Sequence, residues 1–315
     1  MNRYGPLLLA LAALWGASYL FIKVGVDGGF SPAALMAART LIAAVTLTAY
    51  LAATSGWRKM LADLRAAWRA ALVLGALNAA IPFWFVAWGE TRIESGVAAI
   101  AQATVPLCSF LIGLRFLPHE RIGPTRIGGV FLGLAGVAVL AGVHPHGGWP
   151  AAAGTLAIVV ASISYASSGI FGQLRVSGTS GPVLATGSMI AGFLMLLPPA
   201  LIQFPTAMPT RGAIASLLAL GLLGTAAAQL ILFRILVLAG ARKLSLVTYL
   251  MPGFALVYGA LILHEHVRAI AIVGLALILL GVALGSGALR RPLRRRLASR
   301  LRSGARPCAR RTTRR

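Results

Sequence analysis

Acidic residues are scarce in this sequence. The 315 residues include 6 Asp and Glu against 29 Lys and Arg, and charged residues make up only 11% of the chain. Soluble domains carry about 25% charged and about 45–50% apolar residues, whereas here 58% are apolar and the mean hydropathy is +0.86. Folding as an ordinary soluble enzyme is therefore excluded, because so much apolar surface has to lie against lipid.

Cysteine is rarer still. Cys108 lies in an apolar stretch and Cys308 in an arginine-rich tail, so the pair provides no disulfide framework. The patterns HExxH, GxxxxGK[ST] and GxSxG are also missing, so the residues for hydrolysis or ATP use are not visible. We therefore predict no enzymatic activity, no cofactor and no metal site. His264 and His266 flank Glu265, but the pair His264-Glu265 also belongs to an internal repeat described below. Repetition of an ancestral segment explains this pair without zinc binding.

Long apolar runs, by contrast, fill the chain. A membrane-spanning helix needs roughly 20 mostly apolar residues, and a turn cluster at 144–150 divides the longest run in two. The apolar N-terminus resembles a signal peptide, but it shows no small-residue cleavage site and is read as a first span. The expected spans cover residues 6–24, 32–52, 70–89, 95–117, 125–142, 151–171, 182–203, 213–235, 244–263 and 268–288.

Basic residues are unevenly divided between the two sides. Ten spans put both termini on one side, and the other side receives only Lys23, Arg92, Arg211 and Arg268. The side with the termini receives Arg3, Arg58, Lys59, Arg65, Arg69, Arg121, Arg126, Arg175, Arg242, Lys243 and the tail. Because positive loops stay inside, we expect a bacterial plasma-membrane protein with both termini in the cytoplasm.

Two segments of the chain, 104–140 and 250–284, match each other. The matched positions are Pro106 and Pro252, Gly113 and Gly259, His119-Glu120 and His264-Glu265, Gly129 and Gly274, and Gly136 and Gly281. Each half has five spans, an odd number, so the second half must be upside down. We therefore expect an all-α integral membrane protein with ten transmembrane helices in two inverted five-helix repeats, 1–142 and 150–289, followed by a disordered cytoplasmic tail, 290–315. Inverted repeats are typical of transporters, whose substrate site lies where the halves meet.

Short motifs in a fixed order resemble the EamA-type branch of the drug/metabolite transporter superfamily over about residues 1–288. They are Trp15-Gly16-Ala17-Ser18 with Lys23, Ser31-Pro32 with Arg39, Pro106, Glu120 and the Gly129 and Gly136 pair, repeated by Pro252, Glu265, Gly274 and Gly281. The resemblance implies a secondary carrier without ATP, usually an exporter of small metabolites or amino acids, with a cavity lined by spans 3, 4, 8 and 9. Met189 stands where the pattern has arginine, and the tail lies outside the pattern.

Two kinds of residue within the spans indicate where a substrate cavity lies. Repeat-equivalent prolines free backbone carbonyls that lipid cannot satisfy, and polar side chains at membrane depth must face other helices or water. The candidate cavity residues are Trp15, Asn78, Trp84, Gln102, Pro106, Gln229, Tyr249 and Pro252. Packing kinks, interhelical hydrogen bonds and aromatic anchoring are the alternative interpretations.

Arg39 is a buried charge that needs an explanation. It lies about seven residues into span 2, or roughly 10 Å deep, where a guanidinium is costly unless paired. Acidic residues expected on the same side include Asp27, Glu90 and Glu94. We predict an ion pair between Arg39 and one of them, with Glu90 as the first choice, and attraction of an anionic substrate group is the alternative. Because no span centre holds Asp or Glu, proton coupling would have to use Glu90 or a surface group, and facilitated flow or exchange stays open.

The remaining features concern partners. The spacings Gly129-x3-Gly133 and Gly281-x3-Gly285 predict close helix contacts in spans 5 and 10 and leave a homodimer open. We expect the tail 290–315 to bind the anionic inner leaflet rather than nucleic acid. The expected partners are thus a small-molecule substrate and membrane lipids.

An intramembrane enzyme acting on a lipid-linked substrate would need a catalytic group at membrane depth, and a non-transporting scaffold or sensor would need a soluble domain. The sequence shows neither.

Overall fold

The computed structural model describes residues 4–116, 124–141, 148–176, 178–240, 244 and 246–285, and within them it is all-helical. Each expected span corresponds to one helical unit, and three of the units are divided. The units are α1 (Gly5–Asp27), α2 (Pro32–Ser55), α4 (Trp68–Gly75) with η1 (Ala76–Ala80) and α5 (Ile81–Glu90), α6 (Ser95–Gln102) with α7 (Val105–Phe116), α8 (Pro124–Ala141), α9 (Gly148–Arg175), α10 (Gly181–Ile202), α11 (Arg211–Gly221) with η2 (Leu222–Ala227) and α12 (Ala228–Ala239), α14 (Val247–Ile262) and α15 (Ala269–Gly285).

Length and composition agree with membrane spans. Among the described residues, seven units are long and apolar enough to cross a membrane, and α8, α14 and α15 contain shorter apolar helices. Local signals set several boundaries. Ser31 and Thr210 cap the starts of α2 and α11 through their side-chain oxygens, and Gly56 and Gly240, both with positive φ, follow the ends of α2 and α12. The expected ten-helix fold is confirmed.

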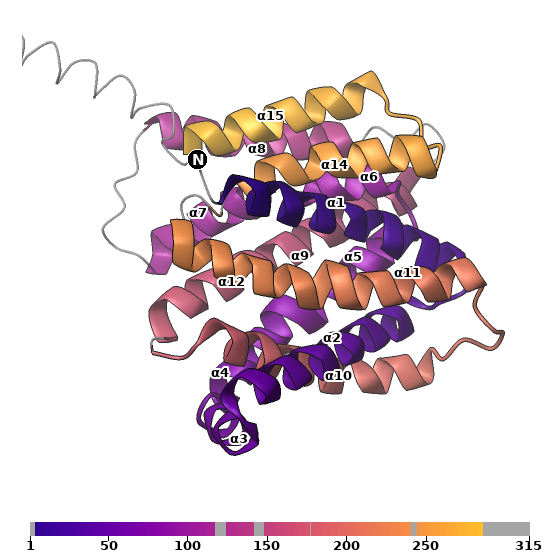
Figure 1. Ribbon diagram of the computed structural model, residues 1–315. Helices are drawn as coiled ribbons and strands as arrows, with labels where there is room; N and C mark the ends of the chain where they lie inside the picture. The colour runs from indigo at the N-terminus through magenta and orange to yellow at the C-terminus, as the bar shows by residue number, and fades with distance from the viewer. Residues whose placement is uncertain are drawn as a thin grey trace, which may run out of the picture.

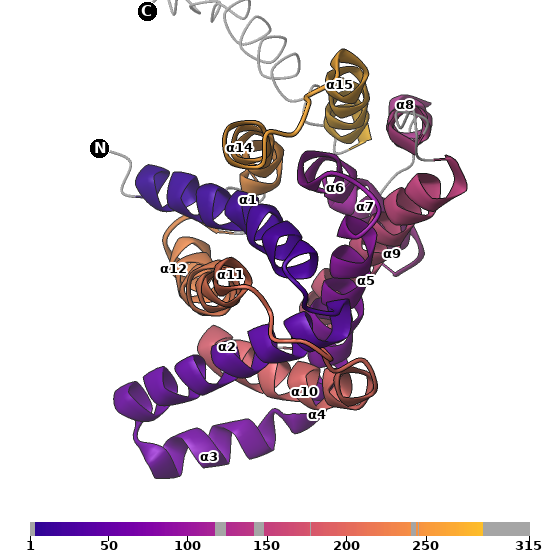
Figure 2. The ribbon, with the colours of Figure 1, turned by 90° about the vertical axis from the view of Figure 1, so that its right-hand side faces the viewer.

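One helix was not expected. The segment after α2, assigned from the sequence to a basic loop, forms α3 (Trp57–Ala66), which lies alongside α2 (Figure 2). Its residue Met60 is buried while Trp57 is 61% exposed, and Lys59 pairs with Asp63 at 2.7 Å. A short basic helix with one apolar face is typical of a helix lying in the membrane interface.

The spans run roughly side by side between two ends of the bundle (Figure 1). The first, called here the α3 end, holds α3, the start of α1 and the end of α12. The opposite end holds the turn between α1 and α2 and the connection from α10 to α11. This arrangement gives every span a direction, and the helices of the second half run opposite to their first-half counterparts, as an inverted repeat requires.

Helix packing follows the same symmetry. Two helices pack along their own repeat counterparts, α2 along α10 and α8 along α15, and Figure 2 shows these two pairs on opposite sides of the molecule. The other contacts exchange in pairs of spans, since α1 packs on α14 as α9 packs on α7, and the eighth span packs on α1 as the third packs on α9. The eighth span makes this contact mainly through α11, whereas the third span makes it mainly through α5. The centre of the molecule is therefore bordered by equivalent helices from both halves.

Glycines bring α8 and α15 together, as the sequence predicts. A Cβ on Gly281 would lie 2.5 Å from the backbone nitrogen of Gly133 and 2.6 Å from the carbonyl oxygen of Gly129. Contacts this close need a residue without a side chain. The glycine face is thus occupied within one chain.

Some sequence predictions fall outside the described residues. They are the role of His119-Glu120, the part of the turn cluster at 144–147, Cys308 and the tail 290–315.

Candidate substrate cavity

A cavity of about 520 Å³ lies between the two halves. Residues of α1, α2, α9 and α10 line it together with the third, fourth, eighth and ninth spans. The cavity therefore involves more of the bundle than the four spans that the family resemblance implies. Its volume lies within the range of small-molecule sites, about 300–1,000 Å³.

Four of the predicted cavity residues line it and four do not. Trp15, Asn78, Gln102 and Gln229 are lining residues. The other four, all within the described part of the chain, are absent from the wall: Trp84, Pro106, Tyr249 and Pro252. Their sequence neighbours Val105, Thr248 and Met251 line it instead.

The physical reasons differ between these residues. Trp84 packs edge-on against Phe85, with ring centroids 5.0 Å apart, and lies over the core. Pro106 is the second residue of α7, where the helix has only just begun. A proline there lacks an N–H that would be unpaired in any case, so Pro106 starts a helix rather than kinking one. Pro252 does lie within α14 but is buried.

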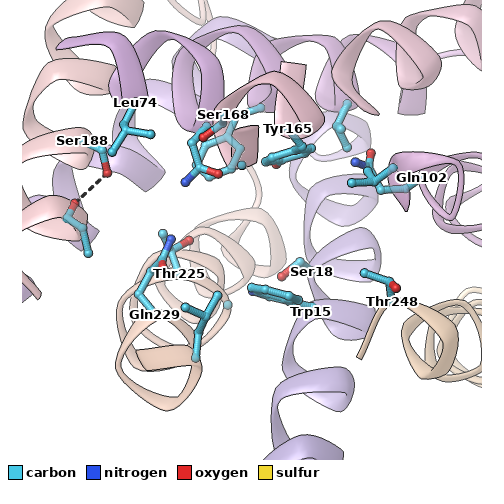
Figure 3. Close-up of a pocket in the computed structure, with 18 of the residues that line it drawn as sticks. Trp15, Ser18, Leu74, Gln102, Tyr165, Ser168, Ser188, Thr225, Gln229 and Thr248 are labelled. Atoms are coloured by element: carbon cyan, nitrogen blue, oxygen red, sulfur yellow. Dashed lines mark hydrogen bonds between the residues drawn. The ribbon is translucent and has the colours of Figure 1, made fainter. Parts of the chain in front are cut away.

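The lining residues of α1 and α9 form repeat-equivalent pairs. The first helix contributes Trp15, Ser18, Tyr19 and Ile22, and α9 contributes Tyr165, Ser168, Gly169 and Gly172. Pro32 and Pro182 lie at the starts of the repeat-equivalent helices α2 and α10, and the same interval separates each of these lining residues from its counterpart. In Figure 3, Trp15 and Ser18 lie on one side of the cavity and Tyr165 and Ser168 on the other.

Five further pairs are separated by the interval between Pro106 and Pro252. They are Asn78 with Gly224, Phe83 with Gln229, Val86 with Leu232, Gln102 with Thr248, and Val105 with Met251. Figure 3 shows Gln102 and Thr248 on opposite sides of the cavity. Two equivalent walls therefore enclose one central space.

The same interval relates two π-helical segments. Asn78 lies in η1 of the third span, and Gly224 and Thr225 lie in η2 of the eighth span. Thr225 Oγ1 donates a 2.8 Å hydrogen bond to the carbonyl oxygen of Leu220, five residues earlier. Single π turns within α-helices are frequent at functional sites, and here both lie on the cavity wall.

Arg39 borders the cavity but does not form the predicted ion pair with Glu90. Its Nε donates to Thr225 Oγ1 at 2.8 Å, and its guanidinium carbon lies 3.8 Å from the centroid of the Phe83 ring. The π turn and the aromatic face thus provide the contacts that a carboxylate was expected to provide. Neither carboxylate oxygen of Glu90 has a hydrogen-bond partner among the described residues. Lys23 donates to the backbone carbonyl of Glu90 at 2.9 Å and pairs with Asp27 at 3.4 Å.

The cavity extends toward the α3 end. Its lining residues Gly172 and Leu236 lie in the last turns of α9 and α12, and Leu184 lies in the first turn of α10. Toward the opposite end the wall stops at Ile22, Arg39 and Val86, each about one turn or more from its helix terminus. The two ends of the bundle therefore differ.

Glu265 helps to close the opposite end. Its carboxylate accepts hydrogen bonds from the Ser95 backbone N–H at 2.8 Å, the Ser95 hydroxyl at 2.9 Å and the Gly96 N–H at 3.1 Å. The segment before α15 is thereby tied to the start of α6. Partial burial and the nearby carboxylate of Glu265 raise the pKa of Glu94, the residue before α6. In the described part of the chain, no three His, Cys, Asp or Glu side chains gather in a way that could hold a metal ion.

Several lining residues were missed at the sequence level: Ser18, Tyr19, Tyr165, Ser168, Ser188, Thr225 and Thr248. A usable signal existed in α9, because its four lining residues repeat the spacing of the four in α1. Ser18 belongs to the family motif Trp15-Gly16-Ala17-Ser18, which by itself does not point to the cavity. The remaining residues carry no sequence signal that separates them from other small polar residues in the spans.

Comparison with known proteins places these features in a family. The profile of the EamA-like transporter family matches the chain twice, over residues 3–142 and 152–286. The two matches correspond to the two halves described above and confirm the internal repeat.

Individual relatives are named as transporters rather than enzymes. The uncharacterized transporter YoaV of Bacillus subtilis is 25% identical, covering 89% of this chain and 95% of that protein. The uncharacterized inner membrane transporter YedA of Escherichia coli is 31% identical over 62% of this chain and 65% of its own length. A probable terminal-alkyne amino-acid exporter of Streptantibioticus cattleyicolor is 29% identical over 88% of this chain and 91% of that protein.

A solved crystal structure shares the fold. Its TM-score is 0.64 at 20% sequence identity, and the match covers 92% of this chain and 99% of that one. The ten-helix bundle, the cavity between inverted halves and the double profile match lead to one conclusion: this chain is a membrane transporter and belongs to the EamA-like transporter family.

Proposed function

We propose that this protein is a secondary carrier that exports a small amphipathic metabolite or amino acid across a bacterial inner membrane by alternating access, without ATP. The observation that carries the proposal is the pairing of the cavity residues, since equivalent walls from inverted halves can exchange roles between two access states. The names of the relatives are in keeping with transport.

The proposed direction rests on charge and cavity shape. Arg58, Lys59, Arg65 and Arg69 lie in or next to α3, and basic residues favour the cytoplasmic side. The α3 end would then face the cytoplasm. Because the cavity extends toward that end, the present state would receive its substrate from inside the cell.

The proposed substrate class rests on the chemistry of the wall. Arg39 offers a positive charge where the cavity ends on the side away from α3. Gln102 and Gln229 offer amides, and Trp15 and Tyr165 offer aromatic surface. A carboxylate directed at Arg39, a further polar group at the amides and an apolar group between the rings would use all three kinds of contact. The S. cattleyicolor relative, by its name an amino-acid exporter, supports this class.

Counterflow in proteoliposomes tests the proposal. The full chain is reconstituted into vesicles loaded with an unlabelled mixture of the twenty proteinogenic amino acids, and uptake of the same mixture in radiolabelled form is followed, with amphipathic metabolites as a second panel. We expect transient accumulation of at least one compound. Folded protein without counterflow for either panel would contradict the proposal.

A pair of glycine substitutions tests whether transport uses the cavity. Gly169 lines the cavity, and Gly253 of α14 does not; a Cβ at either position would meet nothing within 4 Å. Gly169→Trp fills the cavity, so we expect it to abolish counterflow, whereas Gly253→Trp retains it. Equal counterflow from both folded variants would show that the pathway lies elsewhere.

A further inference from the structure

Glu90 is a fully buried carboxyl group that the proposed transport route does not use. It is 0% exposed, and neither of its oxygens accepts a hydrogen bond from the described residues. Burying an ionised carboxylate without donors is costly. The present state of the bundle therefore favours the protonated form of this side chain.

The repeat indicates where Glu90 lies in the other access state. The interval between Pro106 and Pro252 gives Leu236 as the counterpart of Glu90 and Phe233 as the counterpart of Ala87. Both counterparts line the cavity near the α3 end, while Ala87 and Glu90 are 0% exposed near the opposite end. When two inverted halves exchange conformations, residues of one half take over the surroundings of their counterparts.

We propose that Glu90 is a proton-binding site that controls opening of the cavity at the opposite end. The carboxyl group binds a proton when that end is open, and only the neutral form is buried when that end closes. On reopening, the proton returns to the same side, so the site senses pH there without carrying protons across. This inference rests on the proposed alternating access.

The charged neighbours of Glu90 come from several elements. The helix α1 brings Lys23 and Asp27 together with the titratable Tyr19, α2 brings Arg39, and the segment before α15 brings Glu265. Two of these groups are already engaged, because Lys23 pairs with Asp27 and Glu265 caps α6.

The other helices around Glu90 add little charge. From α9, Gly154 and Ile158 lie against Gly89, and the titratable Tyr165 lines the cavity. Glu94 lies on the connection to α6. The groups near Glu90 thus include both signs, and none donates a hydrogen bond to its carboxylate.

Linkage sets the expected direction of the pH effect. The closed form of the opposite end binds one more proton than the open form, so rising pH shifts the equilibrium toward the open form, by up to about tenfold per pH unit. A neutral side chain at position 90 removes this dependence.

Cysteine labelling of Ala87→Cys measures the opening without any substrate. The full chain, with Cys108 and Cys308 changed to serine, is purified in detergent and treated with a membrane-impermeant maleimide from pH 6 to pH 8. Met208→Cys, at a position that is 88% exposed in the loop before α11, corrects for the effect of pH on thiol reactivity. We expect the corrected labelling rate of Ala87→Cys to rise severalfold with pH, and to stay constant when Glu90→Gln is added.

Two results would overturn the inference: an unchanged pH response in Glu90→Gln, or no labelling of Ala87→Cys at any pH. Glu90→Leu, which copies the counterpart Leu236, provides a second neutral variant if Glu90→Gln does not fold, and it should also be insensitive to pH. Counterflow fails or succeeds independently of this labelling, so failure of the proposed function would be recognised separately.

Discussion

Arg39 marks a position at which the two halves differ in charge. Its counterpart in the second half, separated by the interval between Pro32 and Pro182, is Met189, and that methionine is fully buried. Arg39→Met should leave folded carrier, because Thr225 keeps its hydrogen bond to Leu220 and a methionine suits a buried site. If Arg39 binds a substrate carboxylate, counterflow of the amino-acid mixture should fall about 10- to 100-fold, corresponding to the loss of a charged hydrogen bond. Size-exclusion chromatography and counterflow measure the two effects.

Arg39→Lys serves as the matched control. It keeps the charge but loses the planar group that lies over Phe83, so we expect an intermediate rate. If Arg39→Met abolished folded protein while Arg39→Lys did not, Arg39 would be assigned to structure rather than to substrate binding.

Glu265 provides a residue-scale test of stability. Its removal leaves the backbone N–H groups of Ser95 and Gly96 without their acceptor, so Glu265→Ala should cost about 2–3 kcal/mol. Asp63→Ala is the control, because it removes only the exposed pair with Lys59, worth less than about 1 kcal/mol. Thermal unfolding in detergent compares them, and equal shifts in Tm would contradict the capping role.

At this scale the sequence predicts only part of the site. Amides are conspicuous in apolar spans, so Gln102 and Gln229 were predictable. Serines and tyrosines occur throughout the spans, and only helix rotation decides that Ser168 lines the cavity while Ser167 bonds back to its own helix. The partner of Arg39 was not predictable either, since it depends on the local π geometry of η2.

Among the elements, the α8–α15 pair depends on backbone contact. Gly281→Ala places a Cβ within 2.6 Å of backbone atoms that cannot move aside, so we expect a loss of about 1–3 kcal/mol in stability. Gly128→Ala in α8 is the control, because a Cβ there meets nothing within 4 Å. Thermal unfolding distinguishes them, and an unchanged Tm for Gly281→Ala would mean that the two helices can separate.

Hydropathy predicts the membrane-spanning helices but not the shorter elements. Apolar length defines the spans, because a helix needs roughly 20 apolar residues to cross the lipid. A turn cluster divides the longest apolar run into two spans. The helix α3 was missed because its ten residues are too polar for a span-based search. The π turns η1 and η2 were missed because an extra residue in a helical turn changes neither hydropathy nor length noticeably.

For the whole molecule, orientation is the main expectation to test. We expect the α3 end to face the cytoplasm. In intact cells producing the variant with Cys108 and Cys308 changed to serine, an impermeant maleimide should label Met208→Cys at once. Lys59→Cys, also exposed but at the α3 end, should be labelled only after the cells are permeabilised. The reverse pattern would invert the proposed direction of transport.

The pairing of the cavity walls has an energetic consequence. If the halves exchange conformations, a pair of identical residues contributes the same surroundings to both states and cancels in their free-energy difference. Ser18 with Ser168 is such a pair, whereas Tyr19 with Gly169 and Phe83 with Gln229 are not. The resting population of the empty carrier is then set by the mismatched pairs, so a substitution that equalises one of them can move the carrier toward equal occupancy of its two states.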